Sequence, residues 1–261
     1  MDVSRFGGAA LSGKFVGTAG QRSPALDCKG PPMSPPDQAG SPETPLVFGS
    51  VVRTEARLRE IVPVPSARIT SAKVQHRLDA HCAMFFSLSP YLVMSTSDGE
   101  GRCDCSPRGG TPGFVKVLDD QHLLIPELSG NRRADTLRNL IQNPQIGLMV
   151  LIPGYEDFLR VNGEGWVVED QAVLAQASVM GAEPTVGIGV RVREAYMHCA
   201  KAAKRSRVWD PEDWPDASRI AEMAVILRDH TGGIIGDGSV DAIQKILDES
   251  YSNRLFTSSK W

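Results

Sequence analysis

The middle of the chain alternates short apolar runs with polar turns, a pattern that predicts strands joined by hairpins. The tripeptide DDQ at 119–121 lies between two such runs, and Pro153-Gly154 turns the chain between two others. Val190 and Val192 alternate with arginines in the last run. The predicted strands are residues 91–96, 114–118, 122–125, 146–152, 158–168 and 188–197.

Apolar positions at helical spacing predict helices on both sides of this strand-rich region and one within it. Val74, Leu78 and Cys82 would share one face of an early helix, and Ser239 is the predicted N-cap of the last helix. The predicted helices are residues 54–61, 71–82, 134–142, 219–228 and 240–251. Together the two patterns predict a mainly β, α+β protein built on a small antiparallel barrel with helical additions.

The ends of the chain differ from its middle in composition and in the spacing of apolar residues. Residues 1–45 contain seven glycines and seven prolines and show almost no apolar periodicity, which predicts a disordered tail. We expect a helical lead-in at 46–90, the barrel at 91–225 and a C-terminal helical extension at 226–261.

The bulk composition is that of an ordinary globular protein. The 261 residues are 41% hydrophobic and 23% charged, and the net charge is −3. No basic excess points to nucleic acid or to an anionic membrane, so any phosphate site must be local. No apolar run reaches the roughly 18 residues of a membrane helix. Since no secretory signal is recognisable either, we expect a cytoplasmic protein.

The five cysteines fit neither a disulfide framework nor a metal site. Their number is odd and their spacings are irregular, which is consistent with a reducing cytosol. Cys103 and Cys105 are separated by one residue, whereas zinc needs four ligands and usually a wider spacing within each pair. No second pair matches them, so we expect no metal.

A glycine-rich stretch, SPRGGTPGFV at 106–115, is the first that could bind a ligand. Its glycines would let backbone N–H groups approach a ligand closely, and Arg108 adds a cation. A plain turn between strands explains the same composition. The stretch is not a P-loop, because Gly-Lys-Ser/Thr is missing.

A pair of arginines opens the predicted helix in GNRRADTL at 130–137. Arg132 and Arg133 lie where the helix dipole is positive, and a bound anion would relieve this unfavourable placement. Orphan N–H groups and guanidinium forks together make a phosphate site. Alternatively both arginines are solvated and one pairs with Asp135.

Two further stretches carry cations. The segment HCAKAAKRSRVW at 198–209 includes Lys201 and Arg205 and could clamp an anionic planar ligand, or it could be a solvated basic helix. His198 and Cys199 are adjacent, which disfavours a Cys–His nucleophile pair. In the predicted strand at 159–163, Arg160 and Asn162 share one face, which either needs a polar partner or faces solvent.

In order and spacing these stretches resemble the pyridoxamine 5′-phosphate oxidase-like FMN-binding proteins, and in particular a bacterial subgroup of FMN-dependent enzymes. The resemblance covers about residues 55–225. It is carried by the stretches MSTSD, SPRG, PGFV, LLIPE, GNRRADT, NP, IPG, LRVNG and HCAKA.

The resemblance implies a six-stranded antiparallel split β-barrel that forms a homodimer with FMN at the interface. The strand of Gly113, Phe114, Val115 and Lys116 would run beside the flavin, and Ile125 and Pro126 would lie on the facing strand. Arg132 and Arg133 would hold the FMN phosphate, and Arg160 would line the same pocket. The segment from His198 to Arg205 would reach across from the partner subunit.

The expected function is that of an FMN-dependent oxidoreductase acting on an unidentified small molecule. The cofactor would carry the redox chemistry while the protein positions and tunes it. Lys116, Arg160 and Lys201 are candidates for the cation beside reduced flavin, and His198 is the candidate acid or base. The C-terminus is a predicted helix ending LFTSSKW and differs from the Arg-x-His-containing tail of true pyridoxamine-phosphate oxidases, which argues against pyridoxal-phosphate synthesis. A non-catalytic flavin carrier, or a relative that binds haem or deazaflavin, remains an alternative.

Overall fold

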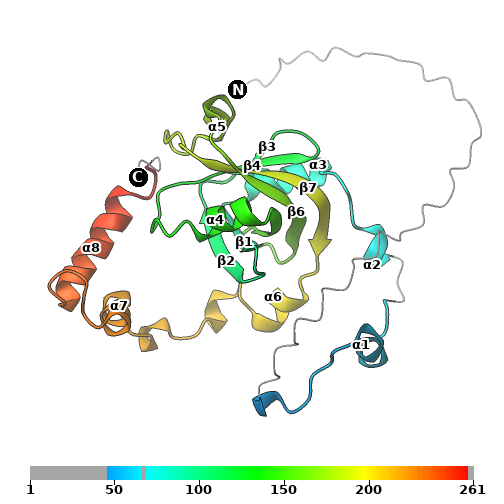
Figure 1. The fold of residues 1–261 in the computed structure, drawn as a ribbon, viewed down its shortest axis with the longest axis horizontal. Helices are drawn as coiled ribbons and strands as arrows, with labels where there is room; N and C mark the ends of the chain where they lie inside the picture. Colours follow the sequence, from blue (N-terminus) through cyan, green and yellow to red (C-terminus); the bar gives the residue numbers. More distant parts are fainter. Residues whose placement is uncertain (1–45, 66–68, 258–261) are drawn as a thin grey trace, which may run out of the picture. The chain divides into compact units, whose positions relative to one another are not determined.

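The computed structural model describes residues 46–65 and 69–257 (Figure 1). The chain divides into two compact units at Val64 and Pro65, and each is described by itself. The first contains the turn η1 (Leu46–Phe48) and the helix α1 (Glu55–Ile61). The side chain of Thr54 caps α1 by accepting a hydrogen bond from the backbone of Arg57, at 3.2 Å. The helix predicted at 54–61 is thereby confirmed, whereas the predicted tail at 1–45 lies outside the described residues.

The second unit is built on one antiparallel sheet, which contains seven strands within the described residues. Their order in the sheet is β2-β1-β5-β6-β7-β4-β3. The strands are β1 (Tyr91–Ser97), β2 (Cys103–Gly109), β3 (Lys116–Val117), β4 (His122–Pro126), β5 (Gln145–Leu151), β6 (Phe158–Val168) and β7 (Gly187–His198). The predicted mainly β architecture is confirmed, with seven strands in place of six.

The additional strand is β2, which the sequence pattern did not predict. Its residues, CDCSPRG, include none of the β-branched or aromatic side chains typical of strands, and they contain a proline and a glycine. The strand lies at one edge of the sheet and pairs only with β1 there. An edge strand tolerates proline because its outer N–H groups need no partner strand.

The sheet curls so that strands from both of its ends enclose the same core. Leu92 and Met94 of β1 belong to one buried cluster with Leu123 and Ile125 of β4. In Figure 1, β1 and β2 lie below β3, β4 and β7 of the same sheet. This curvature brings the β2 edge towards the end of β4 and creates a seam between them.

Helices precede, interrupt and follow these strands along the chain. They are α2 (Ile69–Ala72), α3 (Ala80–Leu88), α4 (Asp135–Gln142), α5 (Gln171–Leu174), α6 (Lys201–Ser206), α7 (Met223–Thr231) and α8 (Val240–Asn253), with 3₁₀ turns η2 (Ala175–Ala177), η3 (Pro211–Asp213) and η4 (Ala217–Arg219). Ser239 caps α8 as predicted, by accepting from the backbone of Ala242 at 3.2 Å. The helix predicted at 219–228 instead begins at Met223, after η4.

The helix predicted at 71–82 is wrong. The chain leaves α2 after Ala72 and runs in a non-helical conformation, so that Gln75 forms a bridge with Ala195 of β7. A new helix, α3, begins at Ala80, where the Asp79 carboxylate accepts from the backbone of Cys82 at 2.8 Å. Pairing with the sheet therefore prevails over the helical spacing of the apolar residues.

The helix α4 is fixed to the sheet by a buried polar contact. The Asn139 side chain donates to the hydroxyl of Thr96 on β1 at 3.0 Å, and both residues are buried. Leu140 of the same helix is buried and lies beside Gly165 of β6. These contacts fix the position of the N-terminus of α4 relative to the seam.

A bulge between β6 and β7 shapes the outer face of the sheet. The register shifts at Asn162 and Gly163, so that Arg193 has no direct partner on β6. A Cβ atom added to Gly163 would lie 2.2 Å from the carbonyl oxygen of Arg191, which only glycine avoids. Among the helices of the described ranges, none has the length and apolar character needed to cross a membrane.

Candidate functional site

The seam between β2 and the chain leading from β4 into α4 contains a cleft of about 540 Å³. We call it the seam cleft. Its volume is within the range of about 300–1,000 Å³ that is typical of small-molecule sites. Residues central to its lining are Asp104, Arg108, Pro126, Glu127, Arg133 and Asp135.

An ion pair joins the two sides of the seam cleft. Arg108 Nε lies 2.9 Å from Glu127 Oε2, and the two side chains are only 14% and 15% exposed. Arg108 Nη1 also donates to the hydroxyl of Ser106 at 2.6 Å. Burial raises the pKa of the Glu127 carboxyl, an effect only partly offset by the guanidinium of Arg108. This pair therefore closes the seam and holds Arg108 at the wall of the cleft.

The N-terminus of α4 lies at the other side of the cleft and lacks a side-chain cap. Ala134 occupies the N-cap position in a left-handed conformation, with φ of 55°. Arg132 is also left-handed, with φ of 62°, which is uncommon for a residue other than glycine. Because Ala134 cannot accept a hydrogen bond through its side chain, the first N–H groups of α4 are available to an anion.

The second cation of the cleft is Arg133, whose ion pair is exposed to solvent. Its Nε donates to Asp135 Oδ2 at 2.7 Å, and the Arg133 side chain is 73% exposed. This is the alternative in which one arginine pairs with Asp135. An exposed pair of this kind contributes at most about 1 kcal/mol, so an incoming phosphate can displace the carboxylate at little cost.

The cleft also carries negative charge, which limits where an anion can bind. Asp104, Glu127 and Asp135 line it together with Arg108 and Arg133. Arg108 is held by the half-buried Glu127, whereas Arg133 can turn away from Asp135. The end of the cleft formed by Arg133 and the N-terminus of α4 is therefore the part that fits a phosphate.

The structure places only some of the predicted cofactor residues in the seam cleft. The seam cleft brings together Arg108, Pro126 and Arg133, whereas Arg132 does not contribute to its lining. The side chains of Phe114, Val115 and Ile125 are buried in the core, so they could contact a cofactor only through their backbone.

The remaining residues of the predicted flavin strand are held by backbone contacts. Gly113 has φ of 80°, and its N–H donates to the carbonyl of Ser89 at 3.3 Å. Lys116 Nζ donates to the carbonyl of Gly113 at 2.8 Å, which holds the loop between β2 and β3 in place.

The other predicted cations lie outside the seam cleft. Arg160 on β6 stacks over the ring of Tyr196, at 5.2 Å from its centroid. Lys201 and Arg205 are exposed on α6, where Arg205 Nε donates to the carbonyl of Lys201 at 3.1 Å. His198 ends β7 opposite Phe158. Within the described chain, these residues do not join Arg108 and Arg133 in one site.

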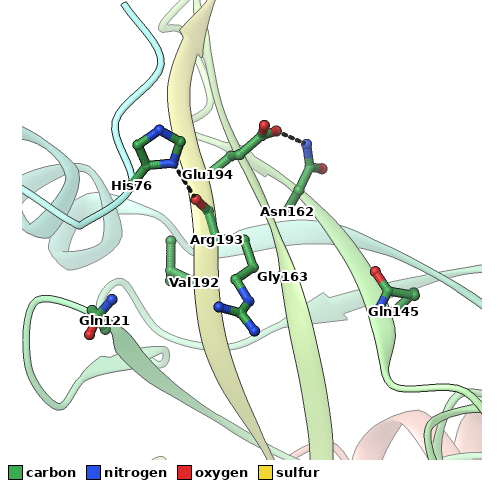
Figure 2. Close-up of a pocket in the computed structure, with 8 residues that line it drawn as sticks. All are labelled: His76, Gln121, Gln145, Asn162, Gly163, Val192, Arg193 and Glu194. Carbon is green, nitrogen blue, oxygen red and sulfur yellow. Dashed lines mark hydrogen bonds between the residues drawn. The ribbon is translucent and has the colours of Figure 1, made fainter. Parts of the chain in front are cut away.

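A second hollow, of about 580 Å³, lies on the outer face of the sheet at the bulge. Figure 2 shows Asn162 pointing to Glu194, to which it donates at 3.2 Å, and His76 beside the carbonyl of Arg193, at 3.0 Å. The polar face predicted for Arg160 and Asn162 thus has partners on β7 in Tyr196 and Glu194. The guanidinium of Arg193 in this hollow is paired with Glu164 at 3.0 Å, and the carboxylate of Glu194 disfavours a phosphate there.

The cysteines take no part in a metal centre in the described structure. Cys82 is buried, and burial raises the pKa of its thiol to about 11. Cys103, Cys105 and Cys199 are exposed free thiols. Across residues 46–65 and 69–257, no group of three or more metal-ligating side chains occurs.

Comparison with known proteins finds a family model that matches the barrel. Residues 78–199 match the family model for pyridoxamine 5′-phosphate oxidase. The resemblance to the pyridoxamine 5′-phosphate oxidase-like family is confirmed. The matched segment contains the whole sheet and α4, and it includes every residue listed above as central to the seam cleft.

Solved structures that are similar to this chain cover less than half of it. One is HupZ from Group A Streptococcus, with 14% identity over 46% of this chain and 93% of that chain and a TM-score of 0.39. Another is an FMN-binding protein from Syntrophomonas wolfei, with 12% identity over 45% and 82% of the two chains and a TM-score of 0.36. A comparison with curated protein sequences finds no match.

Sequence reasoning did not find the acidic residues of the cleft or its C-terminal wall. Asp104 and Glu127 line the cleft, and so does Leu255, more than a hundred residues further along the chain. Their proximity to Arg108 and Arg133 depends on the curvature of the sheet, for which the sequence offers no local signal. The stretch LLIPE contributes to the family resemblance, but nothing in its local pattern marks the carboxylate of Glu127.

Proposed function

We propose that this protein is an FMN-dependent oxidoreductase that binds the phosphate of its cofactor at the end of the seam cleft formed by Arg133 and α4. The observation that carries this proposal is the position of an exposed guanidinium beside an uncapped helix N-terminus, within the segment that matches the family. Backbone N–H groups at a helix start and a guanidinium fork are complementary to a phosphate dianion.

In this proposal each residue of the cleft has a distinct task. Arg133 exchanges its exposed partner Asp135 for the phosphate, and Arg132, on the same loop, adds a second positive charge. Arg108 remains paired with Glu127 and keeps the two walls of the cleft at a fixed separation. The bound flavin supplies reversible two-electron chemistry, and the protein supplies the position and electrostatic surroundings of the ring.

Lys201 and Arg205, which lie outside the seam cleft, are assigned to a second subunit. We propose a homodimer in which the segment from His198 to Arg205 of one chain approaches the flavin of the other. This arrangement explains why Lys201 and Arg205 are exposed and do not line the cleft of their own chain. Light scattering should then give a mass near twice 28.2 kDa, and a monomer that binds FMN fully would contradict the dimeric site.

The cofactor assignment is tested by the spectrum and by a double variant. The purified protein should be yellow with flavin absorption bands, and R132A/R133A should lose the bound FMN while keeping the melting temperature of the FMN-free unchanged protein. Retention of full FMN affinity in the double variant would contradict the phosphate site. The same spectrum separates the alternatives, because haem and deazaflavin absorb at different wavelengths. A flavin carrier would bind FMN and show no turnover with any electron donor.

A further inference from the structure

The end of the described chain is attached to the loop that precedes α4. The hydroxyl of Ser129 donates to the carbonyl of Arg254. The Ser129 N–H donates to the carbonyl of Thr257 at 3.4 Å, and the Thr257 hydroxyl donates to Ser129 Oγ at 2.9 Å. We call residues 254–257 the C-terminal clip. The clip is hydrogen-bonded to Ser129, which lies four residues before Arg133 on the loop that carries the proposed phosphate site.

The C-terminal clip separates two hollows of the surface. Leu255 lines the seam cleft. Phe256 and Thr257 line a neighbouring hollow of about 570 Å³ together with Met180 and Thr185. Neighbouring side chains of the clip therefore face different hollows, and only Leu255 belongs to the cleft.

Leu255 is poised to contact a ligand. It is 58% exposed, although it belongs to the lining of a cleft that is otherwise largely polar. Covering its apolar surface with a ligand would be favourable at about 25 cal/mol for each Å² buried. The clip lies outside residues 78–199, so this wall of the cleft is an addition to the part of the chain that matches the family.

We propose that the C-terminal clip is part of the cofactor site, and that Leu255 packs against the bound FMN and slows its release. This inference rests on the proposed function, because it takes the ligand of the seam cleft to be FMN. Leu255 contributes contact to the ligand, and Ser129 positions the clip.

The dissociation rate of FMN tests this role in the full-length protein. Stopped-flow flavin fluorescence should show L255A releasing FMN about 5- to 20-fold faster than the unchanged protein. S129A should release it about 2- to 5-fold faster, because the clip loses the side-chain hydroxyl contacts but keeps the backbone contact. F256A is the matched control, since it truncates the neighbouring apolar side chain in the other hollow, and its rate should stay within twofold.

Melting temperatures of all variants distinguish a local effect from unfolding, and no change beyond a few degrees is expected. If the unchanged protein binds FMN and L255A releases it at the same rate as F256A, the role of the clip is overturned while the proposed function stands. If the unchanged protein binds no FMN, both the proposed function and the role of the clip are overturned.

Discussion

At the residue scale, Glu127 is the group of the seam cleft whose ionisation is most informative. Burial disfavours its carboxylate more than the guanidinium of Arg108 favours it, so its pKa lies above the ordinary value of 4.5. Between pH 4.5 and the higher pKa of Glu127 in the folded protein, the folded protein keeps a proton that the unfolded chain has released. The free energy of unfolding therefore decreases as the pH rises through this window.

The variant E127Q removes this titrating group, and with it the contribution of Glu127 to the pH dependence of the free energy of unfolding. We expect the difference in the free energy of unfolding, wild type minus E127Q, to decrease as the pH rises from 4.5, measured by urea denaturation at successive pH values. E164Q is a control of opposite sign, because hydrogen bonds from Arg191 and Arg193 lower the pKa of Glu164. Its difference should increase with pH below 4.5. An increase above pH 4.5 for E127Q would mean that the ion pair outweighs burial.

At the scale of single elements, the contact between α4 and β1 determines where the proposed phosphate site lies. Asn139 and Thr96 are both buried and satisfy each other across this interface. The variant T96V would leave the Asn139 amide without its acceptor, at a cost of about 1–3 kcal/mol in the free energy of unfolding. T96S keeps the hydroxyl and should lose less. A T96V protein as stable as the wild type in urea denaturation would show that this contact does not anchor α4.

Elements with their own periodicity could be predicted from the sequence, and elements defined by pairing could not. The apolar run at 146–152 and the capped helix at Ser239 have local signals, and both were predicted closely. The strand β2 lacks β-branched and aromatic residues, and its whole length pairs with β1. Residues 73–79 show helical spacing, yet the bridge between Gln75 and Ala195 holds them in a non-helical conformation.

At the scale of the whole molecule, the same limit applies to the candidate site. The sequence indicated Arg108 and Arg133 because each lies in a stretch with local meaning, a glycine-rich turn or a helix start. It could not indicate that Arg108 pairs with Glu127, or that Leu255 returns to the cleft after α8. These contacts depend on the curvature of the sheet and on the course of the C-terminal helices. The assignment of Lys201 and Arg205 to a second subunit stays a prediction, and so does the place of Arg160 in the cofactor pocket.

The central claim is that the seam cleft recognises the phosphate of a flavin through Arg133 and the N-terminus of α4. Titration of the same protein with FMN and with riboflavin, followed by flavin fluorescence, tests it most directly because the two ligands differ only in the phosphate. Charge-assisted hydrogen bonds contribute about 1.5–3 kcal/mol each. We therefore predict that FMN binds at least about 100-fold more tightly than riboflavin, and that R132A/R133A reduces this preference to less than tenfold. Equal affinity for the two ligands, or an unchanged preference in the double variant, would contradict the account.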